Sequence, residues 1–173
     1  LLDADMGMAN AHILLGINPD LTIKDFFDGS CSLEKVIAEG PKNLKFISGG
    51  SGITEMLNVD KNKKLNFIRS FDQFSKNTDN LIVDVSAGAE DSSLSLLSAS
   101  DKILIVLINE PTSFTDAFTL IKVCYLEFGL KEFCLAVNMV NNDAHGKEVY
   151  SKFNSVIRKF YDINITYVGS IPK

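Results

Sequence analysis

The chain has 173 residues, of which 46% are hydrophobic and 23% charged, and its formal net charge is −5. This length favours one domain with a sizeable core, and the acidic balance gives no electrostatic case for direct nucleic-acid binding. No apolar run approaches the roughly 18 residues of a membrane-spanning helix. The three widely spaced cysteines indicate reduced thiols of a cytosolic protein, not a disulfide framework or a metal site.

Apolar segments of strand length alternate with segments of helical periodicity along the chain. The expected strands are LLDAD (1–5), LKFIS (44–48), LIVDV (81–85), KILIVLI (102–108), FCLAVNMV (133–140) and ITYVGSI (165–171). The expected helices cover 22–27, 32–38, 61–74, 112–128 and 147–160. Because the strands are apolar almost throughout, we expect both of their faces to be covered. This pattern predicts an α/β fold: a doubly wound, mostly parallel sheet with helices on both faces.

Polar side chains stand at the ends of several expected strands, where open parallel sheets bind their ligands. Asp84, followed by the small residue Gly88, has the form of a strand-end magnesium aspartate, although a helix N-cap is an equally good interpretation. Asp3 and Asp5 fit either a magnesium and water-positioning site or the acidic cluster of a phosphoacceptor receiver domain. The stretch between Asp5 and Asp84 holds too many elements for a receiver domain.

Five motifs, in order, resemble the MinD/ParA-type deviant Walker ATPases. DADMGMANAHILLGI resembles their switch I and VDVSAGAE their switch II, and NEPTSFTDAFTLIK, LAVNMVNN and YVGSIP resemble three later motifs. Glu110 and Pro111 stand in swapped order relative to the family pattern. FISGGSGITEML and AVNMVNNDAHGKEVYSKF are similar to the branch of flagellar-number regulators called FlhG, YlxH or FleN.

This resemblance implies a P-loop NTPase fold of the MinD type. It also implies that residues 1–173 are the central and C-terminal part of a single ATPase domain. The first strand, the P-loop and the following helix would then precede Leu1, and an amphipathic membrane-targeting helix would follow Lys173.

The resemblance further implies a catalytic and metal site with Mg²⁺ and ATP as cofactors. Asp5 would orient the attacking water, and Asp3 would lie in the magnesium shell nearby. Asp84 would hold Mg²⁺ largely through water. Phosphoryl transfer depends mainly on positioning and charge neutralisation, which carboxylates and Mg²⁺ can supply.

Five further positions are implied to bind the nucleotide. Asn10 would report the γ-phosphate state to a dimer partner, and Gly88 would let the backbone approach that phosphate. Asn138 would read the adenine edge through its amide. The backbone around Ile171 and Pro172 would border the base.

The implied function is an ATP-binding and ATP-hydrolysing dimerisation switch that regulates flagellar number and placement. Its implied partners are a second copy of itself, the flagellar GTPase FlhF, and flagellar basal-body, C-ring or transcription-regulator proteins. It would be cytoplasmic and peripheral on the inner membrane. Two alternatives stay open, namely a septum-site or partitioning ATPase and a non-catalytic interaction scaffold of the same fold.

Three other features receive structural interpretations. The GGSG run at 49–52 lacks the Gly-Lys-Ser/Thr ending of a phosphate loop, so we expect a turn there, with a branch-specific partner surface as the alternative. His12 and His145 have no partner at ligand or triad spacing and are expected to be structural.

Overall fold

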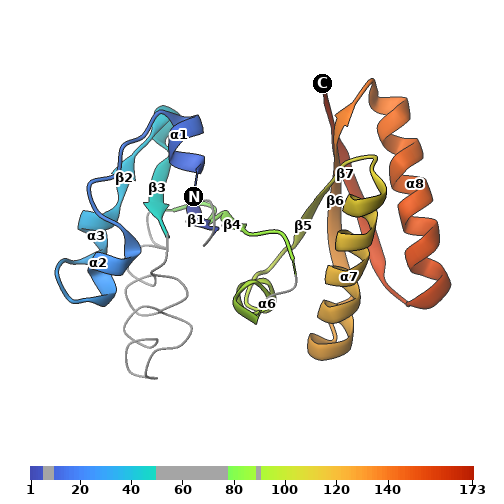
Figure 1. The fold of residues 1–173 in the computed structure, drawn as a ribbon, viewed down its shortest axis with the longest axis horizontal. Coiled ribbons are helices and arrows are strands. Elements are labelled where there is room, and N and C mark those ends of the chain that lie inside the picture. The colour runs from blue at the N-terminus through green and yellow to red at the C-terminus, as the bar shows by residue number, and fades with distance from the viewer. Residues whose placement is uncertain (6–9, 50–77, 89–90) are drawn as a thin grey trace. The chain divides into compact units, whose positions relative to one another are not determined.

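A computed structural model describes residues 1–5, 10–49, 78–88 and 91–173 (Figure 1). The expected helix over 61–74 and most of the GGSG run lie outside the described residues. The chain divides into two compact units, Leu1–Ser86 and Ala87–Lys173, and each is described by itself.

The first unit is built on a four-stranded sheet with the strand order β2-β3-β1-β4. Its strands are β1 (Leu2–Ala4), β2 (Ala38–Glu39), β3 (Lys45–Ser48) and β4 (Val83–Val85). β1 is central and runs parallel to both β3 and β4, as predicted from the apolar runs. β2 was not expected, and it pairs antiparallel with β3.

Within the described part of this unit, four short helical segments accompany the sheet. They are α1 (Ala11–Leu15), α2 (Ile23–Phe27), α3 (Leu33–Val36) and the 3-10 turn η1 (Pro41–Asn43). α2 begins with a capping box, in which the Asp25 carboxylate accepts hydrogen bonds from the Thr22 backbone N–H at 2.7 Å and the Thr22 hydroxyl at 3.0 Å. The helix predicted over 32–38 is too long at its C-terminal end. It stops at Val36 because Ile37 is extended and the next two residues pair with β3.

The second unit contains three parallel strands in the order β5-β6-β7. They are β5 (Leu104–Leu107), β6 (Glu132–Val140) and β7 (Asn164–Pro172), and the helices are α6 (Asp91–Ser98), α7 (Pro111–Phe128) and α8 (Asp143–Phe160). α7 starts with Pro111 at a first-turn position, where the missing N–H costs no hydrogen bond. It ends at Gly129, whose φ of 67° is the left-handed conformation that favours glycine.

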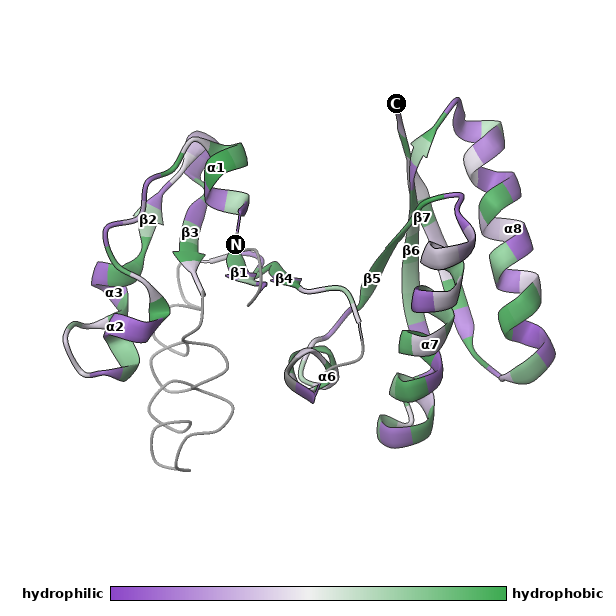
Figure 2. Cartoon of the chain, in the orientation of Figure 1, coloured by the Kyte–Doolittle hydropathy of each residue, from purple (hydrophilic) through white to green (hydrophobic). Residues whose placement is uncertain are grey.

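Aromatic and aliphatic side chains form the core between α7, α8 and the second sheet. The rings of Phe114 on α7 and Phe153 on α8 meet edge to face at 5.5 Å. Fully buried side chains of the same unit include Leu107, Ile121, Leu135, Val137 and Ile157. Figure 2 shows β5 and β6 as largely hydrophobic, whereas α8 carries both hydrophobic and hydrophilic residues along its length.

The predicted fold class is confirmed: both sheets are mostly parallel, and helices connect their strands. Among the described residues, no helix is long and apolar enough to cross a membrane. All three cysteines are free thiols, as expected.

Candidate functional site

Two of the predicted site carboxylates lie side by side on neighbouring strands of the first unit. β1 and β4 are parallel, and their register pairs Asp3 directly with Asp84. Asp3 on β1 is only 1% exposed, whereas Asp84 on β4 is an exposed residue. Asp5 follows two residues after Asp3, so the structure brings all three predicted carboxylates to the same end of this sheet.

The buried carboxylate of Asp3 holds both ends of the segment that follows β1. Its Oδ1 accepts a hydrogen bond from the backbone N–H of Asp5 at 3.2 Å, and its Oδ2 accepts one from the backbone N–H of Ala11 at 3.2 Å. Ala11 is the first residue of α1. Asp3 therefore positions both Asp5 and the start of α1, a role that the sequence did not reveal.

The electrostatics of this corner favour a divalent cation near Asp84. Partial burial, followed by the negative charges of Asp3 and Asp5, raises the pKa of Asp84 above its ordinary value. No cluster of three or more histidine, cysteine or carboxylate side chains within the described residues could hold a metal by itself. Magnesium in phosphoryl-transfer sites usually takes only one or two carboxylates, with phosphate and water completing its shell. An exposed Asp84 beside further negative charge fits that mode of binding.

We expect Asp84→Asn to stabilise the fold slightly at pH 7, raising Tm by about 2 °C or less. A carboxyl whose pKa is raised by folding contributes stability below its unfolded pKa, and that stability is lost as pH rises through the folded pKa. The variant should therefore match the parent near the ordinary aspartate pKa of 3.8 and exceed it at neutral pH.

Thermal melts from pH 3.5 to 7.5 in low salt would measure this difference. Asp20→Asn provides the control, because Asp20 is an exposed carboxylate on the loop before α2. A destabilised Asp84→Asn variant at pH 7 would contradict the expected repulsion.

Asn10 and Gly88 occupy loop positions, and their roles toward a nucleotide stay predictions. Asn10 is exposed and precedes α1, and its carbonyl accepts a hydrogen bond from the N–H of Ile13 at 3.0 Å. Gly88 has a φ of 115°, and no atom of the described residues, its chain neighbours aside, lies within 4 Å of where a Cβ would stand. Glycine adopts this positive φ without the strain that a side chain would cause.

In the second unit, the predicted base-binding residues meet at the ends of β6 and β7. Val137 pairs with Ser170 and Val140 pairs with Pro172, so Asn138 and Met139 together oppose the single residue Ile171. This two-against-one arrangement is a β-bulge, a feature that redirects side chains near the end of a strand. The structure thus places Asn138, Ile171 and Pro172 together.

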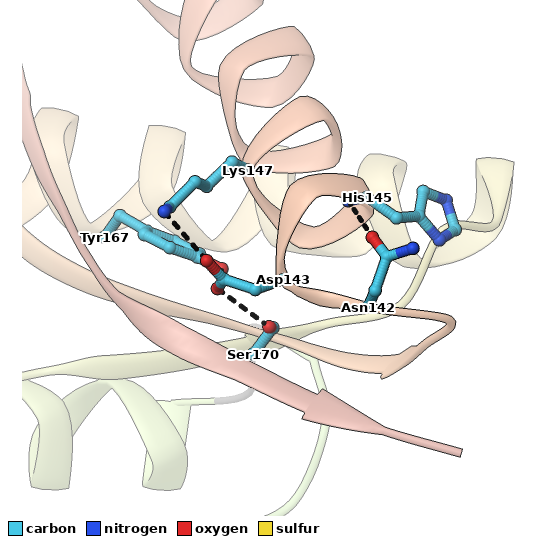
Figure 3. Close-up of polar contacts among 6 residues, drawn as sticks. All are labelled: Asn142, Asp143, His145, Lys147, Tyr167 and Ser170. Carbon is cyan, nitrogen blue, oxygen red and sulfur yellow. Dashed lines mark hydrogen bonds and ion pairs between the residues drawn. The ribbon is translucent and has the colours of Figure 1, made fainter.

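A polar network fastens the start of α8 to β7 just before this bulge region (Figure 3). The Asp143 carboxylate forms an ion pair with Lys147 at 2.7 Å and accepts hydrogen bonds from the Tyr167 and Ser170 hydroxyls, both at 3.3 Å. The hydrogen bond from Lys147 is the main reason that the pKa of Asp143 lies below its ordinary value. The network fixes Ser170, the residue that precedes Ile171.

α8 also begins four residues earlier than the sequence predicted, at Asp143. The Asn142 side chain caps it by accepting a hydrogen bond from the backbone N–H of His145 at 2.9 Å. The His145 ring lies 3.3 Å from the Asn109 amide and accepts a hydrogen bond from the Asn141 backbone N–H at 3.4 Å. His145 thus connects the loops that follow β5 and β6, which agrees with its predicted structural role.

The predicted site residues therefore form two groups. Asp3, Asp5 and Asp84 meet in the first unit, with Asn10 at the start of α1, and the base-binding residues meet in the second. That both groups line one edge of one sheet stays a prediction.

Comparison with known proteins identifies the family. The chain is 37% identical over 172 residues to the antiactivator FleN of Pseudomonas aeruginosa, covering 99% of this chain and 61% of FleN. It is 29% identical over 178 residues to the flagellum site-determining protein YlxH of Helicobacter pylori, covering 99% of this chain and 58% of YlxH. The chain belongs to the MinD/ParA family.

A solved structure shows the same fold. The MinC:MinD cell division protein complex of Aquifex aeolicus matches the fold with a TM-score of 0.70 at 22% identity, covering 99% of this chain and 67% of that chain. No protein-family model matches the chain. The chain spans about three fifths of the length of FleN and YlxH. The segments that resemble switch I and switch II begin on β1 and β4.

Proposed function

We propose that this chain is the central and C-terminal part of a MinD/ParA-type ATPase domain that acts as an ATP-dependent dimerisation switch. The observation that carries the proposal is the register pair of Asp3 and Asp84 at the ends of two parallel strands, with Asp5 held next to them. The likeness to FleN and YlxH supports a flagellar output, the regulation of flagellar number and placement.

In this proposal the three carboxylates have different roles in phosphoryl transfer. Asp5 accepts a hydrogen bond from the attacking water and so aligns its oxygen with the γ-phosphorus of ATP. Asp84 would hold Mg²⁺ largely through water, and the bound ion would supply positive charge to offset that of the phosphates. Asp3 lies at the edge of this shell, and its hydrogen bonds to the N–H groups of Asp5 and Ala11 make it a positioning residue.

The remaining residues bind the nucleotide and respond to its state. Asn138 reads the adenine edge, while Ile171 and Pro172 border the base. Gly88 and Asn10 lie near the γ-phosphate, and Asn10 reports that phosphate to the second subunit. ATP binding then drives homodimerisation and engagement of the cytoplasmic face of the inner membrane. The partners that follow from the flagellar role are the GTPase FlhF and basal-body, C-ring or transcription-regulator proteins.

The proposal is tested in cells that carry the intact protein, meaning the longer protein that we propose contains this chain. Flagella are counted by electron microscopy in the parent strain, a deletion strain, and a strain that carries Asp5→Ala. We expect both mutant strains to show an altered flagellar number. The purified intact protein should hydrolyse ATP only with Mg²⁺ present. Unchanged flagella in the deletion strain would refute the flagellar output, and absence of Mg²⁺-dependent hydrolysis would refute the ATPase.

Residues 1–173, expressed alone, are expected to show no tight nucleotide binding. Most of the free energy of triphosphate binding in P-loop proteins comes from loop N–H groups, a lysine and a helix N-terminus, and this sequence has no Gly-Lys-Ser/Thr phosphate loop. Calorimetric titration with Mg·ATP should show no saturable heat in the micromolar range. Micromolar binding would mean that the phosphate site is formed by residues other than those we name.

A further inference from the structure

We propose that Asp143 is a positioning residue for the nucleotide site, because its carboxylate spans a bulge in β7 and so sets the direction of the strand end that carries Ile171 and Pro172. This inference rests on the proposed nucleotide binding and deepens it. It concerns a side chain that acts through β7 and not by its own contact with the nucleotide.

The first observation is an irregularity in the middle of β7. Leu135 of β6 pairs with Tyr167, and the next residue of β6 pairs with Gly169. Val168 lies between these two pairs without a partner on β6, and it is 53% exposed. Such a bulge bends its strand and changes the direction of the residues beyond it. The position of the last residues of β7 therefore depends on how firmly this bulge is held.

The second observation is that one carboxylate oxygen binds both sides of the bulge (Figure 3). Oδ1 of Asp143 accepts hydrogen bonds from the Tyr167 hydroxyl before the bulge and from the Ser170 hydroxyl after it, both at 3.3 Å. A carboxylate oxygen has lone pairs enough to accept both. Asp143 thus joins the two sides of the bulge from α8, in addition to the hydrogen bonds within the sheet.

The third observation is that the carboxylate is itself held in place. Its other oxygen, Oδ2, pairs with Nζ of Lys147 at 2.7 Å, so Lys147 does not compete with the two hydroxyls. Asp143 is the first residue of α8, and the cap formed by Asn142 fixes the backbone there. The carboxylate therefore binds β7 from a defined position.

These contacts are better suited to setting a position than to stabilising the fold. The side chains of Lys147 and Asp143 are 64% and 61% exposed, and ion pairs as exposed as this contribute little to stability. Buried residues further along α8, Val149 and Phe153 among them, anchor the helix to the core. Loss of the Asp143 carboxylate should therefore leave α8 folded while releasing the end of β7.

A loosely held strand end weakens nucleotide binding, because the ligand must then order it. The three carboxylates proposed for phosphoryl transfer lie in the other unit, so the rate of hydrolysis of bound ATP should not change. We expect Asp143→Ala in the intact protein to raise the KM for ATP about three- to tenfold and to leave kcat unchanged. Rates of ATP hydrolysis over a range of ATP concentrations separate the two quantities.

Glu148→Ala is the matched control for this variant. Glu148 forms an ion pair with Lys152 at 2.7 Å, also four residues apart on α8 and similarly exposed, and within the described residues its carboxylate makes no hydrogen bond to β7. This variant should keep the parental KM. Asp143→Asn retains an oxygen acceptor for the hydroxyls and should recover most of the affinity. Ser170→Ala should raise KM by itself and add little to the effect of Asp143→Ala.

The position of the β7 end is measured directly in the 173-residue chain without nucleotide. In ¹H–¹⁵N spectra, Asp143→Ala should shift the amide signals of Ile171 and Lys173 more than Glu148→Ala does. Signals that move no further than in the control would overturn the positioning role.

A parental KM in Asp143→Ala, or a lower kcat, would overturn the link between Asp143 and nucleotide binding. If the intact parent protein hydrolyses no ATP, the proposed function fails. The amide signals still decide in that case whether Asp143 positions β7, so the two failures are distinguishable.

Discussion

Replacing Asp5 with alanine in the intact protein is expected to lower the rate of ATP hydrolysis by about 10²- to 10⁴-fold while leaving ATP binding unchanged. In the proposed mechanism the Asp5 carboxylate aligns the attacking water and contacts neither the base nor the phosphates. The variant keeps the backbone N–H through which residue 5 bonds to Asp3, so the local fold should survive. ATP should therefore accumulate uncleaved, and the dimer should persist.

Phosphate release measures the hydrolysis rate, and size-exclusion chromatography with ATP and Mg²⁺ measures the dimer. Asp20→Ala is the matched control, since it removes an exposed carboxylate from the same unit. Normal hydrolysis by Asp5→Ala would remove Asp5 from the mechanism. Loss of ATP binding would instead assign it to the nucleotide site.

Adding one methyl group at Gly146 is expected to cause the largest loss of stability among these changes. Gly146 is buried in α8, and a Cβ there would stand 2.6 Å from Cβ of Ser170 and 2.8 Å from the Tyr167 hydroxyl oxygen. Such overpacking costs about 1–3 kcal/mol, and the first atom that the methyl meets is fixed close to the β7 backbone. The gain of about 1 kcal/mol in helix propensity offsets only part of this cost.

Chemical denaturation of Gly146→Ala measures the net loss, and a double-mutant cycle with Ser170→Gly assigns its cause. Ser170→Gly removes the Cβ that the new methyl would meet, so the double variant should be more stable than the sum of the two single effects predicts. Strict additivity would show that the close approach of α8 to β7 is not what requires glycine.

Much of the fold could be predicted because apolar runs and helical periodicity dominate its local structure. All six expected strands exist, and α7 was predicted to within one residue of its start. The errors fall where short-range signals are weak. The first turn of α8 is polar and looks like a loop, and only the cap formed by Asn142 reveals it as helix. β2 exists because its two residues pair with β3, a long-range contact that no local pattern shows.

The residue types of the site could be predicted from the sequence, but the hydrogen bonds that join them could not. The sequence shows that Asp3 is a carboxylate at a strand end, but not that backbone N–H groups from two positions would bind its two oxygens. It gives no sign that Met139 adopts a positive φ, because methionine has no preference for that conformation. Both features depend on how distant parts of the backbone meet.

The two hydrogen bonds of Asp3 also bear on how the first unit could move. The backbone N–H groups of Asp5 and Ala11 both donate to this one buried carboxylate. Any motion that separates Asp5 from Ala11 must break a hydrogen bond to the buried Asp3 carboxylate. The rates at which these two amide hydrogens exchange with solvent would therefore measure the same local opening.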